Sequence, residues 1–282
     1  MLLRWGRAPA HDAIASRDAS MRLTFLGTGT SMGVPVIGCR CAVCTSPDPH
    51  NHRLRTSALL EAGGRTLLFD AGPDLRQQAL AAHISRVDAV LLTHAHADHI
   101  SGLDDLRPLN FAQRSAIPLF GSATTLGMVR ERFSYAFHDS SRGSTRPELE
   151  LCEIRSGVAF RAAGVAALPF DVQHGTWSIT GFRIGRLGYV TDASALPPES
   201  LALLRGLDVL VLNALRYAEH PTHFNVAQAC AVAAELQPRR TLLVHMTHDL
   251  EHAAVNAALP DGVELAYDGL VVEAGDSYDS AP

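Results

Sequence analysis

The chain has 282 residues, of which 47% are hydrophobic and 19% charged, a balance typical of a globular protein with a substantial core. Its formal net charge is −5 and its sequence pI is near 6.3, which argues against a basic surface for long nucleic acid. No apolar run approaches the length of a membrane span and no signal-peptide pattern opens the chain, so we expect a cytoplasmic protein that does not enter the membrane.

The N-terminal segment, residues 1–20, carries no periodic pattern and is expected to be a disordered leader. Met21 stands directly before the first convincing strand, Arg22–Leu26, and residues 21–282 are expected to form a single domain. The glycine-rich segment Gly27–Gly33 superficially resembles a phosphate-binding loop. It lacks the Lys-Ser/Thr ending and runs into Val-Pro instead of a helix, so its glycines are interpreted as room for a close backbone approach.

Three of the five cysteines fall within six residues, at Cys39, Cys41 and Cys44. An odd total argues against a disulfide framework, and the clustering indicates thiolate ligation of a metal. Cys152 and Cys230 lie in apolar surroundings and are expected to be small buried side chains.

The next segment predicts a β-hairpin, a short helix and a buried strand. Two strands, Ser57–Glu61 and Thr66–Phe69, flank Gly63-Gly64, and a helix is expected at Leu75–Ala82 before a strand at Val87–Leu92. The segments expected after it are an irregular stretch at Gly102–Phe111, a strand at Ile117–Phe120, a helix at Ala123–Phe137, and a loop at 138–147 that is either a mobile lid or a plain solvated loop.

The second half repeats the pattern of strands first and strands alternating with helices afterwards. The expected strands are Val158–Arg161, Val165–Val172, Trp177–Arg183, Leu187–Val190, Val209–Leu212, Thr241–Val244 and Leu270–Glu273. The expected helices are Pro198–Leu204, Val226–Leu236 and Leu250–Ala258. Because the pattern occurs twice, we predict an α/β fold of two mixed sheets packed face to face with helices outside, a four-layer αββα sandwich.

A segment with three histidines and an aspartate follows the strand at Val87–Leu92. It reads Thr93-His94-Ala95-His96-Ala97-Asp98-His99. Neutral imidazole and carboxylate suit zinc, manganese or iron, and four such groups exceed what one small ion can easily take from a single loop. The H-x-H-x-D-H spacing therefore predicts two metal ions side by side.

Three further residues of ligand type follow apolar strands, namely His174, Asp192 and His245. Ligands placed just past the C-terminal ends of strands can converge on one point. We therefore expect these three residues to complete the metal centre.

Together with Asp70, these motifs resemble those of the metallo-β-lactamase superfamily, in the same order from Asp70 to His245. The resemblance implies the αββα fold and a dinuclear centre. It implies that His94, His96 and His174 hold one metal, that Asp98, His99 and His245 hold the other, and that Asp192 bridges them. Asp70 would orient a ligand or loop without itself binding metal.

The cysteine cluster makes the resemblance more specific. A structural zinc needs four ligands, and His248 lies three residues beyond His245. The pairing resembles the phosphoribosyl cyclic phosphodiesterase branch, known from phosphonate degradation, which carries a Cys₃His zinc apart from the catalytic pair. The resemblance implies that Cys39, Cys41, Cys44 and His248 bind zinc and pin the early loop to the last catalytic strand. A cysteine trio used for redox chemistry or packing is the alternative.

The segment His220-Pro221-Thr222-His223-Phe224 is similar to one at the active site of that branch. The similarity implies that His223 donates a proton to the leaving oxygen, and His223 and Asp98 are the predicted catalytic residues. A histidine with structural hydrogen bonds alone is the alternative for His223. Arg216 and either Arg53 or Arg55 are candidates for contacting phosphate.

The predicted reaction is hydrolysis of a small cyclic or diester phosphate. Two divalent ions about 3.5–4 Å apart lower the pKa of a shared water, so a metal-bridged hydroxide would attack phosphorus and His223 would protonate the departing alkoxide. The candidate substrates are a phosphoribosyl 1,2-cyclic phosphate and a 2′,3′-cyclic nucleotide. The metals are predicted to be manganese or zinc, with manganese favoured by the resemblance, which also implies a possible homodimer.

Other activities of the same fold are weighed against this prediction. A lactone or thioester hydrolase is the main alternative, because the same hydroxide attacks a carbonyl carbon equally well. A tRNA-processing nuclease is disfavoured, since only 18 positions separate His174 from Asp192, too few for an extended substrate arm. A metal-storage or scaffold protein is the non-enzymatic alternative, which the complete ligand set disfavours.

Overall fold

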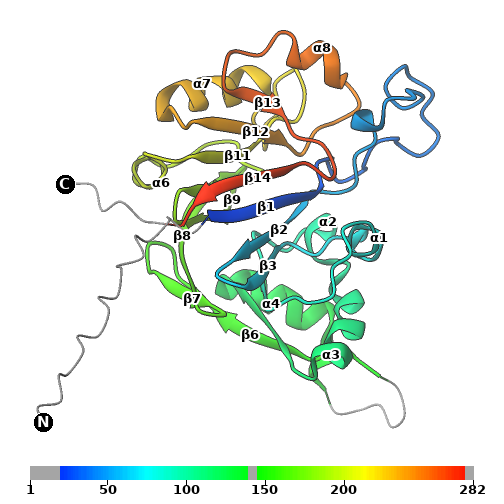
Figure 1. Ribbon diagram of the computed structural model, residues 1–282, viewed down its shortest axis with the longest axis vertical. Helices are drawn as coiled ribbons and strands as arrows, with labels where there is room; N and C mark the ends of the chain where they lie inside the picture. The colour runs from blue at the N-terminus through cyan, green and yellow to red at the C-terminus, as the bar shows by residue number, and fades with distance from the viewer. Residues whose placement is uncertain (1–19, 139–144, 277–282) are drawn as a thin grey trace, which may run out of the picture.

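Two β-sheets pack face to face, with helices on the outer side of each, in the computed structural model of the chain (Figure 1). The structure describes residues 20–138 and 145–276. The predicted αββα sandwich is thus confirmed. The leader predicted at residues 1–20 lies outside the described residues except for Ser20, which begins the first strand, and so do residues 139–144 of the predicted loop.

The first sheet has, within the described residues, seven strands in the order β14-β1-β2-β3-β4-β5-β6. They are β1 (Ser20–Gly27), β2 (Ser57–Ala62), β3 (Arg65–Phe69), β4 (Ala89–Leu91), β5 (Ile117–Gly121), β6 (Leu149–Glu153) and β14 (Val271–Gly275). Pairs from β14 to β3 are antiparallel and pairs from β3 to β6 are parallel. Gly63 and Gly64 turn the β2–β3 hairpin with φ of 56° and 73°, a conformation that favours glycine.

The second sheet is likewise part antiparallel and part parallel. Its strands within the described residues run in the order β13-β12-β11-β10-β9-β8-β7. They are β7 (Phe160–Ala162), β8 (Val165–His174), β9 (Trp177–Ile184), β10 (Leu187–Tyr189), β11 (Val209–Asn213), β12 (Arg240–Val244) and β13 (Val263–Leu265). Pairs from β7 to β10 are antiparallel and pairs from β10 to β13 are parallel.

Helices connect the parallel strands and cover the outer faces, because parallel neighbours need a crossover. Those of the first half are α1 (Leu75–Ala81), α2 (Ala97–Ile100), α3 (Arg107–Gln113), α4 (Ala123–Arg132) and α5 (Ser134–Phe137). Those of the second half are α6 (Pro198–Leu203), α7 (Val226–Leu236) and α8 (His252–Asn256). Two short 3₁₀ helices, η1 (Pro49–Asn51) and η2 (Leu103–Leu106), lie in the first half.

The central strands are apolar along their whole length because both of their faces are buried. In β11, Val209 and Val211 join the core between the two sheets, whereas Leu210 and Leu212 join the core beneath α6, α7 and α8. Strands covered on both sides are expected to be continuously hydrophobic. This packing explains why the apolar runs in the sequence located the strands well.

Four secondary-structure predictions were wrong or incomplete. Gly102–Phe111 is helical instead of irregular, since it contains η2 and the start of α3, and Pro108 stands in the first turn of α3 where no amide hydrogen bond is lost. The helix predicted at Ala123–Phe137 is divided at Phe133, whose φ of −109° and ψ of 35° leave the helical region. Strands β6 and β13 are not among the predicted strands.

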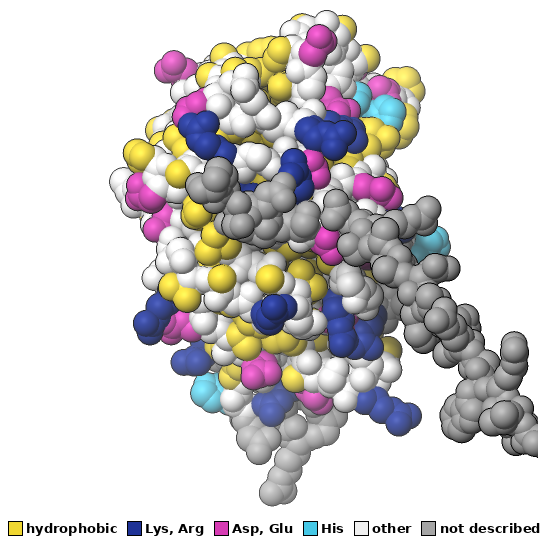
Figure 2. Space-filling model, turned by 60° about the vertical axis from the view of Figure 1, so that its left-hand side comes forward, with side chains coloured by type: hydrophobic (Ala, Val, Ile, Leu, Met, Phe, Trp, Pro, Cys, Tyr) yellow, Lys and Arg dark blue, Asp and Glu magenta, His cyan; other side chains and the backbone are white. Residues whose placement is uncertain are grey.

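Charged side chains of both signs are interspersed over the face drawn in Figure 2, where dark blue and magenta alternate without forming one continuous basic stripe. Within the described ranges, we find no helix with the length and apolar character needed to cross a bilayer.

Candidate metal centre

The predicted ligands converge where strands of both sheets end. Asp70 follows β3, His174 closes β8, Asp192 lies beyond β10 and His245 follows β12. Asp70, Asp192 and His245 have φ of 56°, 59° and 57°, in the left-handed region that residues other than glycine rarely adopt. Strained backbone of this kind concentrates at functional sites.

One cluster consists of His94, His96, His174 and Asp192, whose ligand atoms all lie within 4.8 Å of one another. His94 Nε2 and His96 Nδ1 are 2.9 Å apart. Two nitrogens at right angles around an ion, each about 2.05 Å from it, are separated by about 2.9 Å. The pair of imidazoles therefore fits a single metal ion.

The second cluster consists of Asp98, His99, Asp192 and His245. His99 Nε2 and His245 Nε2 lie 3.3 Å and 3.5 Å from Asp98 Oδ2. His99 Nε2 is buried without a hydrogen-bond partner, as expected of an atom that serves as a metal ligand. Asp192 belongs to both clusters, which is the position predicted for a bridging carboxylate.

A buried hydrogen-bond chain sets the orientation of the histidines. Asp70 Oδ2 accepts from His99 Nδ1 at 2.7 Å and from Thr93 Oγ1 at 2.7 Å, and Thr93 Oγ1 lies 3.0 Å from His94 Nδ1. Both Nδ1 atoms are thereby engaged, which leaves the two Nε2 atoms free to face the centre. The Thr222 carbonyl orients His174 in the same way, because it accepts a hydrogen bond from His174 Nδ1 at 2.8 Å.

Burial and neighbouring charges shift the pKa values of this centre in opposite directions. Burial alone lowers the pKa of His99, but Asp192, Asp70 and Asp98 outweigh it and raise that pKa well above its usual value. Burial likewise raises the pKa of Asp192, and the neighbouring His245 and His99 overcome it and lower the pKa well below its usual value. Asp192 is therefore held ionised among imidazoles, and carboxylate and imidazole groups are ligands that suit divalent cations.

His223 lies at the edge of this centre. Its Nε2 is 3.2 Å from Asp192 Oδ2, and its Nδ1 is 2.8 Å from Thr222 Oγ1 and 3.2 Å from His220 Nδ1. Burial lowers the pKa of His223, and the hydrogen bond with Asp192 opposes that change. His223, the predicted catalytic histidine, thus lies beside Asp192, and Thr222 and His220 hold the other side of its ring.

The predicted zinc ligands also converge. His248 Nδ1 lies 3.3 Å from Cys39 Sγ, 3.5 Å from Cys41 Sγ and 3.2 Å from Cys44 Sγ. Ligand atoms at tetrahedral angles around zinc, with Zn–S of about 2.3 Å and Zn–N of about 2.05 Å, are about 3.5 Å apart. The backbone amide of Cys44 donates to Cys41 Sγ and lowers the pKa of that thiol to about 6, which favours a thiolate.

Arg53, one of the candidates for contacting phosphate, does not face the metal centre. It is buried, and its guanidinium donates to the carbonyls of Thr247 and Leu250 instead of facing the centre. Arg55 is paired with Asp74 at 3.1 Å. Arg216 donates to backbone carbonyls of the loop that leads to His220.

Three features of the centre were not found in the sequence. Thr93 connects Asp70 with His94, as described above, and its place directly before His94 was an available signal. Gly72 lies against the backbone of Asp98, where an added Cβ would come within 2.1 Å of the carbonyl oxygen. The ring of Trp177 lies 4.8 Å from the ring of His96, which joins the β8–β9 hairpin to the metal centre.

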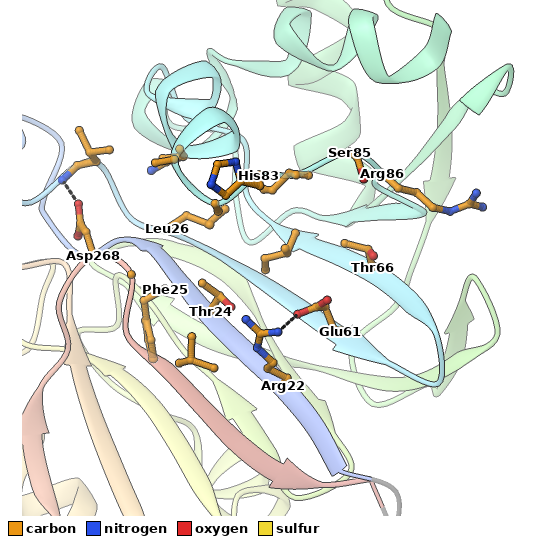
Figure 3. Close-up of a pocket in the computed structure, with 18 residues that line it drawn as sticks. Arg22, Thr24, Phe25, Leu26, Glu61, Thr66, His83, Ser85, Arg86 and Asp268 are labelled. Carbon is orange, nitrogen blue, oxygen red and sulfur yellow. Dashed lines mark hydrogen bonds and ion pairs between the residues drawn. The ribbon is translucent and has the colours of Figure 1, made fainter. Parts of the chain in front are cut away.

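A separate cavity of about 490 Å³ lies between α1 and the outer surface of β1 and β2 (Figure 3). It is rimmed by Arg22 and Glu61, which form an ion pair at 3.4 Å, and Asp268 lies at its far end. None of the predicted metal ligands lines this cavity. It is therefore distinct from the metal centre.

The chain belongs to the β-lactamase superfamily. The family model described as beta-lactamase superfamily domain matches residues 65–246, which include the metal centre but not the cysteine cluster or His248. This match confirms the superfamily resemblance. The conclusion at this level is a hydrolase fold with candidate divalent-metal sites.

Similar proteins carry several different names. A crystal structure of a new diphosphatase from the PhnP family is 42% identical, with a TM-score of 0.85 over 90% of this chain and 97% of that one. An octanoyltransferase of Porphyromonas gingivalis is 38% identical over 89% of this chain and 51% of its own length, and a ribonuclease Z of Mycolicibacterium gilvum is 30% identical over 69% and 66%. The chain thus spans about half the length of the octanoyltransferase and slightly less than two thirds of the ribonuclease Z.

Proposed function

We propose that this protein is a dinuclear metal-dependent phosphodiesterase that hydrolyses small cyclic or diester phosphates. The observation that carries the proposal is the pair of adjacent ligand clusters that share Asp192. Similarity over almost the whole of a PhnP-family diphosphatase supports chemistry at phosphorus. Diphosphates therefore belong among the substrates to be tested.

The proposed ligands are His94, His96 and His174 for one ion, Asp98, His99 and His245 for the other, and Asp192 between them. When bound, two divalent ions, manganese or zinc, supply a water that ionises near neutral pH and positive charge that stabilises phosphoryl oxygens. A further zinc at Cys39, Cys41, Cys44 and His248 would be structural.

The remaining steps belong to side chains of the chain itself. Asp70 and Thr93 hold His94 and His99 in the tautomers that present Nε2, so the ligands are oriented before any cation arrives. His223 carries a proton near Asp192 and delivers it to the departing alkoxide, with Thr222 and His220 fixing its ring. The product is a phosphomonoester.

The test is hydrolysis of bis(p-nitrophenyl) phosphate by apoprotein reconstituted with Mn²⁺ or Zn²⁺. We expect turnover by the wild type and none by His96→Ala, which removes one ligand. His138→Ala is the matched control, because His138 is an exposed histidine at the end of α5. Absence of turnover from fully metallated wild type, with this ester and with diphosphates, would reject the proposal.

A lactone or thioester hydrolase is the second candidate, and the similarity to a protein named octanoyltransferase favours it. Octanoyl transfer is chemistry at an acyl carbon, which the same ionised water can attack. Turnover of octanoyl thioesters or lactones in the absence of phosphodiester turnover would select this candidate.

A further inference from the structure

The cavity drawn in Figure 3 lies on the outer face of the first sheet, away from the metal centre. Side chains of β1 alternate between the two faces of the sheet, so Leu23 joins the core between the sheets whereas Arg22 and Thr24 line the cavity. The end of α1 and residues 83–86 form the other wall. A volume of about 490 Å³ is typical of sites that bind small organic molecules.

The arginines of the cavity are already paired with carboxylates. Arg22 pairs with Glu61 at 3.4 Å, and Arg86 pairs with Asp88 at 2.6 Å. The register places Arg22 directly opposite Glu61 on the neighbouring strand, which keeps the two side chains together. An anionic ligand would have to compete with these carboxylates for a guanidinium, so the cavity is poorly suited to anions.

Asp268 lines the same cavity and forms no ion pair within the described part of the chain. Its Oδ1 accepts from Thr28 Oγ1 at 2.8 Å and its Oδ2 accepts from the Leu54 amide at 2.7 Å, and both donors are neutral. Burial raises the pKa of this carboxyl to about 7, although the more distant charge of Arg53 opposes the rise. A carboxylate can accept about four hydrogen bonds, so Asp268 has acceptor capacity left for a cation.

A second acceptor lies at the same end of the cavity. Gln78 lines the cavity and is 2% exposed, and its Nε2 donates to the Arg55 carbonyl at 2.8 Å. Because Asp268 binds the amide of the preceding residue, Leu54, the two side chains flank one short backbone segment. Gln78 Oε1 is buried and accepts from no group among the described residues. Buried polar atoms normally have a partner, so this end of the cavity lacks a donor.

We propose that this cavity binds a small organic cation that has one primary ammonium group and an apolar body. The ammonium group has three N–H donors, and it donates to the Asp268 carboxylate and to Gln78 Oε1. The apolar body packs on Leu26, Leu54 and Leu59, which also line the cavity. This binding site goes beyond the proposed hydrolysis, because none of the candidate metal ligands lines the cavity.

The first test is calorimetric titration of the protein, reconstituted with Mn²⁺, with hexylamine, hexan-1-ol and hexanoate near pH 8, above the pKa of Asp268. We expect saturable binding of hexylamine, about tenfold weaker binding of hexan-1-ol and no binding of hexanoate, because a hydrogen bond between ionised groups is stronger than one with a neutral donor. Equal affinity for the amine and the alcohol would show that the apolar wall alone holds the probe. That result, tighter binding of hexanoate, or no binding of hexylamine would overturn the proposal.

Removal of the negative charge gives the second test. Asp268→Asn should weaken hexylamine binding by about 10- to 100-fold, the loss expected for a hydrogen bond between charged groups. Asp261→Asn is the matched control, because Asp261 is exposed and does not line the cavity. Unchanged affinity in folded Asp268→Asn would show that the carboxylate does not bind the amine and would overturn the proposal.

A third test leaves the carboxyl in place and fills the cavity. Ala81→Leu enlarges a side chain of α1 that lines the cavity and should weaken hexylamine binding by about tenfold. Gln77→Leu is the matched control, since Gln77 lies on the same helix but is exposed and outside the cavity. Equal affinity in wild type and Ala81→Leu would place the amine elsewhere. Titration of apoprotein should give the wild-type affinity, and binding that requires added metal would assign the amine to a metal ion; either contrary result overturns the proposal.

Discussion

Replacing Arg53 with methionine tests how the turn between the two candidate metal sites is held. The buried guanidinium donates through Nη1 to the Thr247 carbonyl at 2.9 Å and through Nη2 to the Leu250 carbonyl at 2.7 Å. These carbonyls flank His248, the proposed zinc ligand, and the same turn begins at His245. Methionine retains much of the side-chain volume and removes both donors.

Two opposing free-energy terms decide the result. Burial lowers the pKa of Arg53 to about 10, against the attraction of Asp268, Glu251 and Asp48, so keeping the charge inside costs about 3 kcal/mol. Each hydrogen bond from a charged donor contributes about 1.5–3 kcal/mol, and the two together contribute about 3–6 kcal/mol. The hydrogen bonds outweigh that cost by about 0–3 kcal/mol, so Arg53→Met should lower the free energy of unfolding by about 1.5 kcal/mol, the middle of this range.

The assays are urea unfolding and competition for zinc with a chromogenic chelator. A loosened His248 should also weaken zinc binding by about tenfold, the lower range for loss of a group that orients a ligand. Arg22→Met is the control, because its ion pair with Glu61 is exposed and should contribute less than about 1 kcal/mol. If Arg53→Met unfolds and releases zinc as the wild type does, the guanidinium does not hold this turn.

Four further substitutions probe other parts of the structure. Asp70→Asn should weaken metal binding at the second cluster by about 10- to 100-fold, because an amide has one oxygen and cannot accept both from the Thr93 amide at Oδ1 and from Thr93 Oγ1 and His99 Nδ1 at Oδ2. Calorimetric titration of apoprotein checks this, and unchanged affinity would contradict it. Gly72→Ala should destabilise the protein, because its Cβ would lie 2.1 Å from the Asp98 carbonyl oxygen. Gly127→Ala in α4 meets no atom within 4 Å and should stabilise the protein by about 0.5–1 kcal/mol. Thermal unfolding of both variants compares them, and equal shifts in Tm would refute the reasoning. Burial raises the pKa of Asp268 to about 7, so the folded state binds the proton more tightly than the unfolded chain, and this residue's contribution to stability is lost as pH rises from about 4 through 7. Asp268→Asn should therefore flatten the fall in unfolding free energy between pH 5 and pH 8 measured in urea, and an unchanged slope would show that the carboxyl is ionised throughout.

The convergence of the candidate metal ligands could be predicted because their signals are local in the sequence. A His or Asp at the end of an apolar strand, or within three residues after it, lies at a sheet edge, and His94, His174, Asp192 and His245 all follow this pattern. The order of those residues then carried the family resemblance that the match to residues 65–246 confirms. The cysteine cluster was equally local, since three thiols within six residues leave few uses other than metal binding.

Contacts across long separations could not be predicted in the same way. Arg53 donates to carbonyls 194 and 197 residues away, so the sequence left it a candidate for contacting phosphate although its guanidinium binds the turn after β12. Arg53 and the turn after β12 are close in space because Met246 pairs with the loop after β1. The Met246 amide donates to the Thr28 carbonyl, and the Met246 carbonyl accepts from the Thr30 amide. The loop after β1 and the turn after β12 therefore form one unit, held by these backbone hydrogen bonds and by Arg53. Because His245 and His248 share this unit, the candidate metal centre and the cysteine cluster each depend on the same few backbone hydrogen bonds for the placement of one histidine.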